Sequence, residues 1–216
     1  MKYKAVFFDF DYTLGDATDA IFAGFTHGMT LLGWPVPDRE AVRNTVGLPL
    51  ELAYTNLTGD PDPEHQQQFR TAFASVARPM QAQGVPLFPG AADLLRALHD
   101  TGIRVAVAST KQRGVLEGIL GKHQLLDTLD FIIGGDDVAH AKPAPDCIFL
   151  GLERMGLAPG DLLFCGDTTI DAATAQNAGC DFAAVLNGTT PAEAFLEYPH
   201  VRICPDLLDL RSHLNI

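Results

Sequence analysis

Two acidic residues near the start of the chain, Asp9 and Asp11, have the spacing of a site for a metal or a phosphate. They follow the apolar run Ala-Val-Phe-Phe at 5–8, which predicts a short strand buried on both faces. Alternate strand residues point to one face, so the two carboxylates begin on the same side. Because buried neighbouring carboxylates repel each other, a divalent cation between them removes a large cost, and Mg²⁺ suits oxygen ligands. The pair therefore indicates a metal site with a potential carboxylate nucleophile. An acidic, helix-capping turn is the alternative.

Two more polar stretches could act on the same ligand. Ser109 and Thr110 follow the run Val-Ala-Val-Ala, and a hydroxyl with the turn's backbone amides can bind a phosphate oxygen. Lys142 precedes Pro143, which favours a stiff turn that presents the ammonium at a fixed place. Such an ammonium can neutralise an aspartate and a phosphate together. A helix cap and a solvated loop lysine are the alternatives.

The fourth stretch, Gly-Asp-Thr-Thr-Ile-Asp at 166–171, again follows a predicted strand. Asp167 and Asp171 are four residues apart, so they share one face at a predicted helix start. A capped helix start is the alternative reading. The four stretches together are more specific than any one of them, because each lies at the end of a different predicted strand.

The elements that must position these residues alternate between strand and helix from residue 86 onward. Such alternation predicts an α/β fold with a Rossmann-like parallel sheet and right-handed crossovers. In open sheets of this kind ligands bind at the carboxyl ends of the strands. After the strand at 5–8, we expect strands at 103–108, 128–133, 162–165, 182–186 and 201–203, and helices at 90–100, 113–120, 145–155, 169–178, 191–196 and 207–214.

The segment between the first strand and residue 86 has only helical patterns. We expect helices at 16–32, 38–45, 50–57 and 64–83, with turn clusters rich in Gly and Pro between them. The predicted organisation is an α/β core of residues 1–15 and 86–216, and a helical insertion of residues 16–85 after the first strand. Residues 14–18 and 86–89 are the expected hinges.

Composition excludes several classes of partner. The formal charge of −12 and the isoelectric point of about 4.8 disfavour nucleic acid and anionic membranes as partners, since both bind basic surfaces. The four cysteines form no Cys-x-x-Cys pair and the histidines no ligand spacing, so we expect reduced thiols and no zinc site. We also expect no signal peptide and no membrane span, and a cytoplasmic location.

The four stretches, in this order, resemble the motifs of the haloacid dehalogenase superfamily. The resemblance extends over nearly the whole chain, from Asp-Phe-Asp-Tyr-Thr-Leu at 9–14 to Ala-x-x-Ala-Gly at 175–179. The helical insertion resembles the α-helical cap of the phosphoglycolate phosphatase and β-phosphoglucomutase branch. The stretches 109–113 and 136–145 are most similar to phosphoglycolate phosphatases and related inorganic pyrophosphatases.

The resemblance implies a role for each matching residue. Asp9 would attack phosphorus and form an aspartyl-phosphate, and Asp11 would serve first as acid and then as base. The cap would close over the site and choose the substrate. Asp9, the backbone carbonyl of Asp11 and Asp167 would bind Mg²⁺, and Asp171 would orient water ligands or Lys142. Ser109 and Thr110 would bind the phosphate, and Lys142 would stabilise the nucleophile and the transition state.

Two departures from the family pattern bear on specificity. Tyr12 stands where the family often has glycine, so a side chain there could narrow the entrance or alter cap motion. No arginine follows Gly-Leu-Pro at 47–49, where a mutase cap would grip a second phosphate. Arg43, Lys111 and Arg113 are candidates for contacting an anionic leaving group, with solvated surface as the alternative for each.

The expected function is that of a Mg²⁺-dependent phosphatase acting on a small phosphorylated metabolite, first of all 2-phosphoglycolate. Pyrophosphate, a sugar phosphate, a nucleotide or a β-phosphoglucomutase-like reaction are alternatives, and the expected state is a monomer or small homo-oligomer. A dehalogenase is disfavoured because Asp11 occupies a position that is not acidic in that branch. A receiver-type signalling domain would be shorter and lack the insertion. A non-catalytic regulatory protein on this fold remains the alternative from a different class.

Overall fold

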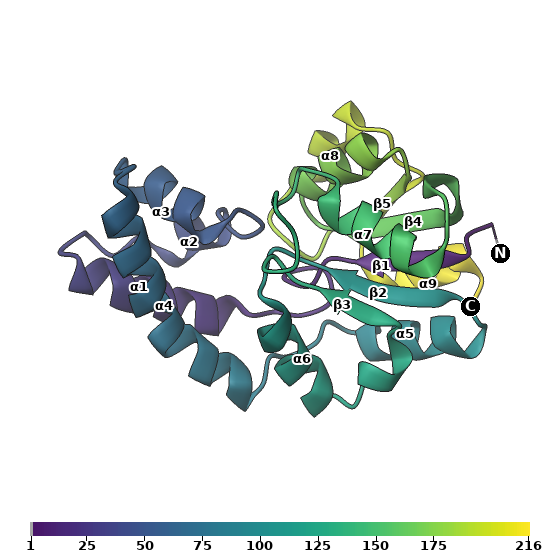
Figure 1. The fold of residues 1–216 in the computed structure, drawn as a ribbon, viewed down its shortest axis with the longest axis horizontal. Helices are drawn as coiled ribbons and strands as arrows, with labels where there is room; N and C mark the ends of the chain where they lie inside the picture. The colour runs from purple at the N-terminus through teal and green to yellow at the C-terminus, as the bar shows by residue number, and fades with distance from the viewer. Residues whose placement is uncertain (1) are drawn as a thin grey trace. The chain divides into compact units, whose positions relative to one another are not determined.

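The computed structural model describes residues 2–216 and divides them into two compact units (Figure 1). One unit contains the residues up to Asp16 together with Pro86–Ile216, and the other contains Ala17–Val85. Asp16, expected in the helical insertion, belongs to the first unit because its N–H donates to the carbonyl of Pro86 at 2.8 Å. No helix within residues 2–216 has the length and hydropathy needed to cross a membrane.

The first unit is built on a parallel sheet in the order β3-β2-β1-β4-β5-β6, which confirms the predicted α/β fold class. Phe8 of β1 is in register with Val107 of β2 on one side and with Cys165 of β4 on the other. The chain builds β2 and β3 outward from β1, then returns to place β4 on the other side of β1. The strands are β1 (Ala5–Phe8), β2 (Arg104–Ala108), β3 (Phe131–Ile133), β4 (Leu162–Gly166), β5 (Asp181–Val185) and β6 (Arg202–Cys204).

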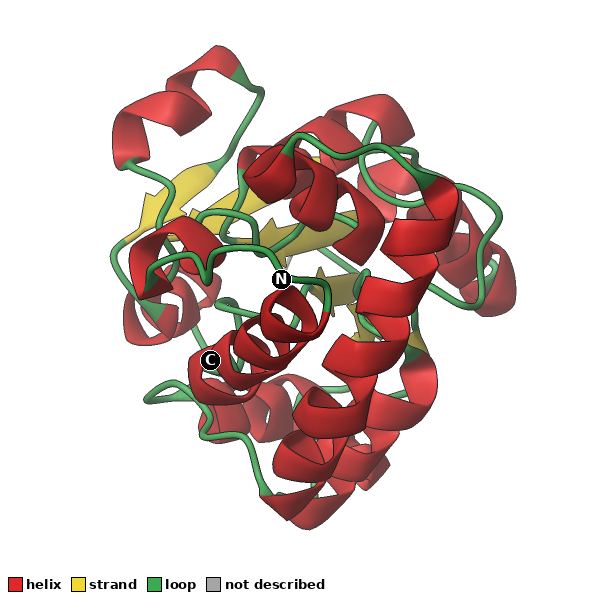
Figure 2. Ribbon diagram, turned by 90° about the vertical axis from the view of Figure 1, so that its left-hand side faces the viewer, coloured by secondary structure: helices red, strands yellow, loops and turns green. Residues whose placement is uncertain are grey.

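Helices cover both faces of this sheet, as the crossover rule for parallel strands requires (Figure 2). In Figure 1, α7 and α8 lie on one side of the sheet and α5 and α6 on the other. The helices of this unit are α5 (Ala91–Asp100), α6 (Arg113–Lys122), α7 (Asp146–Met155), α8 (Thr169–Ala178) and α9 (Leu207–Leu214), with short 3₁₀ helices at η1 (Leu126–Thr128), η2 (Pro159–Asp161) and η3 (Ala192–Glu197).

The core of the first unit explains why the strands read as unbroken apolar runs. All four residues of β1 and all five of β4 are buried, because both faces of the sheet are covered. Phe7 contacts Phe131 edge to face, and Phe182 lies between Phe164 and Phe195. These rings hold the central strands rigidly, so the loops that follow them start from fixed positions.

The second unit is helical throughout its described residues. Its core is an aromatic cluster in which Phe69 contacts Phe25, Tyr54 and Phe73. Helices α1 and α4 pack closely because Gly28 of α1 leaves room for the ring of Phe69. The helices are α1 (Thr18–Leu31), α2 (Arg39–Arg43), α3 (Leu50–Thr58) and α4 (Pro63–Gln83).

Two chain segments connect the units, and they pair with each other. The N–H of Phe88 donates to the carbonyl of Leu14 at 2.9 Å, and Gly15 and Leu87 form an antiparallel bridge. The chain therefore leaves and re-enters the first unit at neighbouring positions. These segments include the residues that the sequence suggests as hinges.

Several predicted elements differ from the structure at their ends by one to three residues, and two of these differences have a local cause. The strand expected at 128–133 is present only at Phe131–Ile133, because residues 126–128 form a 3₁₀ turn stabilised by the Thr128 hydroxyl, which donates to the carbonyl of Leu125. The helix expected from residue 16 begins at Thr18, with Ala17 as an N-cap that offers no side-chain hydrogen bond. The first difference arises because local hydrogen bonding competes with the apolar pattern. At the second, the N–H of Asp16 donates to the carbonyl of Pro86, which holds Asp16 in the connecting segment.

Candidate active site

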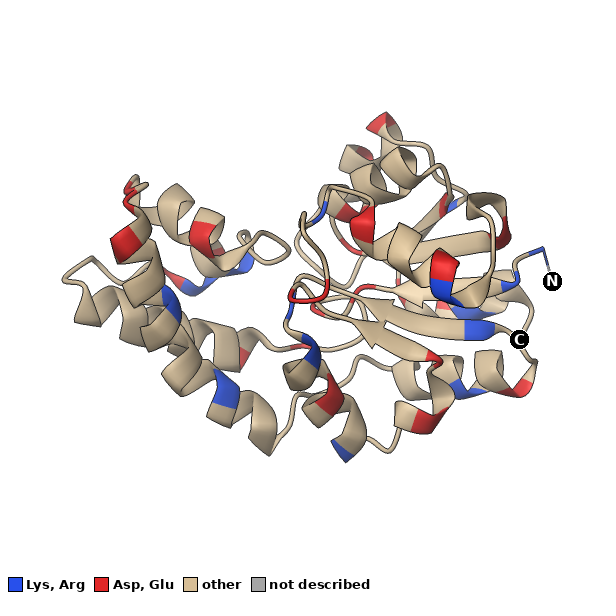
Figure 3. Ribbon diagram, in the orientation of Figure 1, with Lys and Arg blue, Asp and Glu red and all other residues tan. Residues whose placement is uncertain are grey.

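The site lies where strand order reverses, between β1 and β4, as expected for ligand sites in open parallel sheets. The N–H of Asp9 donates to the carbonyl of Cys165 at 2.9 Å, which sets the end of β1 beside the end of β4. Asp167 follows β4 directly. Figure 3 shows acidic residues in the loops that follow the strands.

Three carboxylates and one ammonium form the centre of the site. Asp9, Asp167 and Asp171 each offer an oxygen within 4.8 Å of the others, and all three residues are buried. The ammonium of Lys142 lies 2.9 Å from Asp9 Oδ1 and 2.5 Å from Asp171 Oδ1. When all four groups are ionised, their formal charges leave an excess of two negative charges among buried residues.

Burial and neighbouring charges shift the pKa values of Asp9, Asp167 and Lys142. Burial raises the pKa of Asp9 to about 6, although the nearby Lys142 ammonium acts in the opposite direction. Burial also raises the pKa of Asp167 well above its ordinary value, with Asp171 and Asp9 adding to the effect. Burial by itself lowers the pKa of Lys142, but Asp171 and Asp9 outweigh it, so the pKa is raised and the ammonium stays charged.

The residues present fit a divalent cation. Among the described residues, Asp167 Oδ2 and Asp11 Oδ1 are buried oxygen atoms without a hydrogen-bond partner. Asp9 Oδ1 lies at ion-pair distance from Lys142 but outside hydrogen-bond geometry. Buried carboxylate oxygens without partners are costly. A hard cation with two positive charges would satisfy Asp167 Oδ2 and balance the excess charge of the cluster.

Three supporting residues were missed by the sequence reasoning. The Thr13 hydroxyl donates to Asp167 Oδ1 at 2.9 Å, and Asn187 donates to the carbonyl of Thr13 at 3.1 Å. The Thr168 hydroxyl donates to Asp171 Oδ2 at 2.6 Å, so both oxygens of Asp171 are engaged. The available signal was position: Asn187 follows the predicted strand at 182–186, and Thr13 lies within the first motif.

Gly166 is required by the close approach of α8 to the end of β4. A Cβ at this position would lie 2.4 Å from Asp171 Cβ, which is far inside van der Waals contact. The absence of a side chain at Gly166 thus allows Asp171 to lie in contact with the end of β4.

The loop after β2 supplies the hydroxyls expected to bind phosphate. Ser109 is buried, and its N–H donates to the carbonyl of Ile133 at 3.0 Å, so it is fixed against β3. Because Phe8 is in register with Val107, this loop leaves the sheet at the same edge as Asp9. Thr110 follows it and is partly buried.

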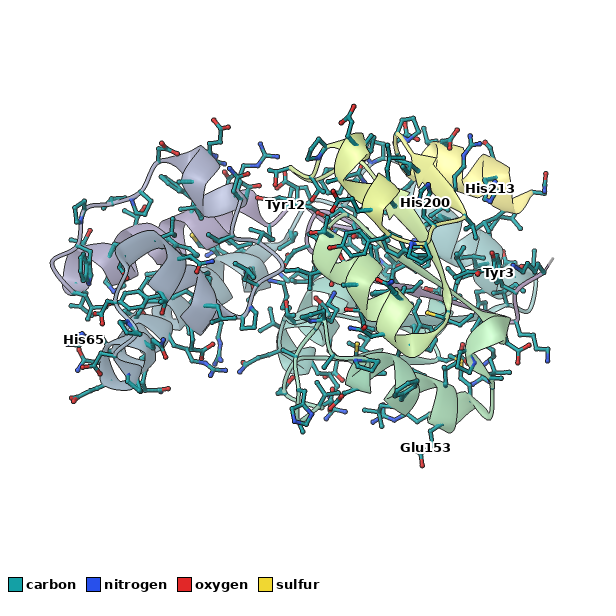
Figure 4. The ribbon with its side chains drawn as sticks, turned by 90° about the horizontal axis from the view of Figure 1, so that it is seen from above. Tyr3, Tyr12, His65, Glu153, His200 and His213 are labelled. Atoms are coloured by element: carbon teal, nitrogen blue, oxygen red, sulfur yellow. The ribbon has the colours of Figure 1, made fainter. Side chains whose placement is uncertain are left out.

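The four suggested substrate contacts have different surroundings. Lys111 pairs with Asp11, with Nζ 3.0 Å from Oδ2, whereas Arg113 pairs with Asp137 at 3.2 Å. Tyr12 is buried in the loop after β1, at the opposite end of that strand from Tyr3 (Figure 4). Arg43 ends α2 in the helical unit, so its role stays a prediction.

Comparison with known proteins identifies the family. The model of the haloacid dehalogenase-like hydrolase family matches residues 6–185, which include all four motifs. The chain belongs to the haloacid dehalogenase-like hydrolases. This confirms the family that the motifs suggested.

Individual relatives of this haloacid dehalogenase-like chain cover most of its length. The chain is 34% identical over 81% of its length to "Probable phosphatase IndB" of Dickeya dadantii, covering 77% of that protein. It is 30% identical to the phosphoglycolate phosphatase of Escherichia coli strain K12, covering 99% of this chain and 93% of the relative. A solved haloacid dehalogenase-like hydrolase of Bacteroides fragilis matches with a TM-score of 0.94 and 36% identity, over 97% of this chain and all of that one.

Proposed function

We propose that this protein is a Mg²⁺-dependent phosphatase that hydrolyses a small phosphomonoester through an aspartyl-phosphate on Asp9. The observation that carries the proposal is the buried cluster of Asp9, Asp167 and Asp171 around the Lys142 ammonium. A buried nucleophile with a fixed cation beside it, at the strand ends of a hydrolase fold, is suited to attack on phosphorus.

In the first step, a carboxylate oxygen of Asp9 attacks phosphorus as the bond from phosphorus to the leaving oxygen breaks. Asp11 donates its proton to that leaving oxygen, so the alcohol departs neutral. Lys142 stabilises the ionised form of Asp9 and the charge on the transferred group. Ser109 and Thr110 hold the phosphoryl oxygens.

In the second step, Asp11, now ionised, removes a proton from water. The water oxygen attacks phosphorus and the bond from phosphorus to Asp9 breaks, which releases phosphate and restores both carboxyl groups. One residue thus acts as acid and then as base, and the site ends each cycle in its initial protonation state.

Mg²⁺ would be held by Asp9, Asp167 and the backbone carbonyl of Asp11. When bound, it supplies charge neutralisation for the phosphoryl group and the acidic cluster. Asp171 instead orients Lys142, because one of its oxygens accepts from Lys142 and the other from Thr168.

The leading substrate is 2-phosphoglycolate. Support comes from the Escherichia coli phosphoglycolate phosphatase, which this chain matches over nearly its full length. Pyrophosphate, sugar phosphates and nucleotides are the runners-up. A mutase reaction is less favoured because no arginine follows residues 47–49.

The test is phosphate release from a panel of 2-phosphoglycolate, pyrophosphate, sugar phosphates and mononucleotides, with Mg²⁺ or with EDTA. We expect one strongly preferred substrate, no release with EDTA, and a loss of roughly a thousandfold or more in Asp9→Asn. Asp161→Asn is the matched control, because it removes a carboxylate that pairs with Lys4 away from the site.

The outcomes separate the alternatives. Normal turnover in correctly folded Asp9→Asn removes Asp9 as the nucleophile. Weak, Mg²⁺-dependent release from many compounds keeps the mechanism but replaces 2-phosphoglycolate with a broad substrate range. No release from any compound by a folded, Mg²⁺-binding protein favours the non-catalytic regulatory alternative.

A further inference from the structure

Lys111 makes an ion pair that the sequence did not suggest. Its Nζ lies 3.0 Å from Asp11 Oδ2, and the side chains are only 9% and 14% exposed. An ion pair sheltered to this degree is screened less by solvent than a surface pair. The Lys111 ammonium therefore forms an ion pair with the carboxyl group that the proposed mechanism uses as acid and base.

The backbone of Lys111 is fixed on both sides. Its N–H donates to the Ser109 hydroxyl at 3.3 Å, and its carbonyl accepts from the N–H of Gly135 at 3.0 Å. A Cβ on Gly135 would lie 2.4 Å from the carbonyl oxygen of Thr110, so the two loops are in direct backbone contact. Lys111 thus starts from a rigid support, which reduces the entropy cost of holding its long side chain in one place.

The two oxygens of Asp11 have different surroundings. Lys111 lies beside Oδ2, whereas Oδ1 is buried and has no hydrogen-bond partner among residues 2–216. A cation on one oxygen fixes the rotation of the carboxyl group and leaves the other oxygen available for a proton.

Neighbouring cations have other partners. Lys142 lies between Asp9 and Asp171, and Arg113 pairs with Asp137. Lys142 and Lys111 therefore lie beside different reacting carboxyl groups, Lys142 beside Asp9 and Lys111 beside Asp11.

We propose that Lys111 is a positioning residue that orients Asp11 for proton transfer, and that it does not grip the leaving group. This inference rests on the proposed phosphatase function. It predicts that Lys111 matters when the leaving oxygen needs a proton, and matters little when it does not.

The test compares kcat/KM of Lys111→Met on three substrates. Glycerol 2-phosphate and p-nitrophenyl phosphate have leaving groups that carry no charge before the bond to phosphorus breaks, whereas the leaving group of 2-phosphoglycolate carries a carboxylate. The ratio kcat/KM reports the steps up to departure of the leaving group, and p-nitrophenolate departs without a proton. We expect a loss of about tenfold or more on glycerol 2-phosphate and less than about threefold on p-nitrophenyl phosphate. Lys111→Arg should recover part of the loss.

Two controls isolate the pair. Lys4→Met breaks another ion pair of 3.0 Å, between Lys4 and Asp161 near the other end of β1, and should leave these kcat/KM values unchanged. In an Asp11→Asn background, Lys111→Met should cause no further loss on glycerol 2-phosphate, because the group it orients is already disabled.

Three outcomes overturn the inference. They are equal losses on glycerol 2-phosphate and p-nitrophenyl phosphate, additive losses in the double variant, and a loss confined to 2-phosphoglycolate, whose leaving group carries a carboxylate. If the wild-type protein hydrolyses none of these compounds, the phosphatase proposal itself fails. A double-mutant cycle on the free energy of unfolding then tests whether Lys111 and Asp11 interact. Zero coupling between Lys111→Met and Asp11→Asn would contradict the ion pair on which the inference depends.

Discussion

At the scale of single residues, the site combines groups that are expensive to bury with groups that offset the cost. Asp167 illustrates this, because burial raises its pKa and the Thr13 hydroxyl, which donates to Oδ1, acts in the opposite direction. Lys142 offsets Asp9 and Asp171, and it lies 5.5 Å from the ring centroid of Phe164. The remaining excess of negative charge would favour the binding of a divalent cation.

We expect Asp167→Asn to remove the stabilisation that Mg²⁺ gives. A cation that binds only the folded state at a hundred times its dissociation constant adds about 2.7 kcal/mol to the free energy of unfolding. Thermal unfolding with Mg²⁺ and with EDTA measures this difference in the wild type and in the variant. In EDTA the variant should be as stable as the wild type or more so, because a buried acid is removed; an undiminished Mg²⁺ effect would contradict the ligand assignment.

Tyr12 has a strained backbone conformation. Its φ of 60° lies in the left-handed region, which costs residues with a Cβ about 1 kcal/mol or more. Tyr12→Gly and Tyr12→Ala both remove the buried ring, but only glycine relieves the strain. We therefore expect Tyr12→Gly to be more stable than Tyr12→Ala by about 1 kcal/mol in urea unfolding.

The same pair of substitutions at Arg96, an exposed position inside α5, is the matched control. There alanine should be the more stable by about 1 kcal/mol, since glycine is the poorer helix former. The same order of stability at both positions would show that Tyr12 is not strained.

At the scale of elements, close packing of α1 on α4 depends on two glycines with different neighbours. A Cβ on Gly28 would lie 2.6 Å from the ring of Phe69, which is fully buried. A Cβ on Gly24 would lie equally close to Phe73, whose side chain is only partly buried. The buried ring has no room to move aside, whereas the partly exposed ring has some.

We expect Gly28→Ala to destabilise the helical unit by about 1–3 kcal/mol and Gly24→Ala to cost less. The protein's only tryptophan, Trp34, lies in this unit, and its indole N–H donates to the Tyr54 hydroxyl at 2.9 Å. Its fluorescence therefore reports unfolding of the helical unit in urea. A larger loss of stability in Gly24→Ala than in Gly28→Ala would contradict the expectation that the Phe73 ring can move aside more easily than the Phe69 ring.

The helical unit also contains a pH-dependent pair, His65 and Asp60 (His65 is labelled in Figure 4). The hydrogen bond that the His65 ring N–H donates to Asp60 raises the pKa of His65. The pair therefore stabilises the folded unit fully below about pH 6.5 and less as pH rises through the folded-state pKa above it. The pKa of Asp60 is lowered, chiefly by the backbone N–H of Asp62, so its contribution is lost only as pH falls below about 3.8.

We therefore expect the urea midpoint of Trp34 fluorescence to fall as pH rises above about 6.5, by a small amount because His65 is exposed. His65→Gln should remove this part of the pH dependence, and the difference between the two proteins isolates it from other histidines. An identical pH profile in the variant would show that the pair makes no contribution.

At the scale of the whole molecule, the helical unit is inserted into the chain of the sheet unit without disturbing the sheet. The chain leaves at Asp16 and returns at Pro86, and the Asp16 N–H and the Pro86 carbonyl are 2.8 Å apart. An insertion between neighbouring residues leaves the strand order and register of the sheet intact.

We expect a variant in which a short Gly-Ser linker replaces residues 17–85 to fold. It should unfold cooperatively in urea and keep the stabilisation by Mg²⁺, because Asp9, Asp167 and Asp171 all belong to the sheet unit. Its kcat/KM values should differ less among the compounds of the panel than those of the full chain. Absence of a cooperative transition would contradict the independence of the sheet unit.

The sequence by itself determined the alternation of elements, the fold class and the family, because apolar periodicity and four short motifs are local properties of the chain. It also placed Asp9, Asp11, Ser109, Lys142 and Asp167 in segments that follow strands, and parallel strands bring their carboxyl ends to one edge. Their roles remain predictions.

Only the tertiary structure decided which side chains in the site contact each other. The pairing of Lys111 with Asp11 and the support of Asp167 by Thr13 join residues about 100 and 154 positions apart. Such contacts depend on which strands are neighbours and on how loops are held, and neither is encoded in local spacing. The sequence specified which groups could react, and the packing of the β1, β2 and β4 loops specified which group each cation serves.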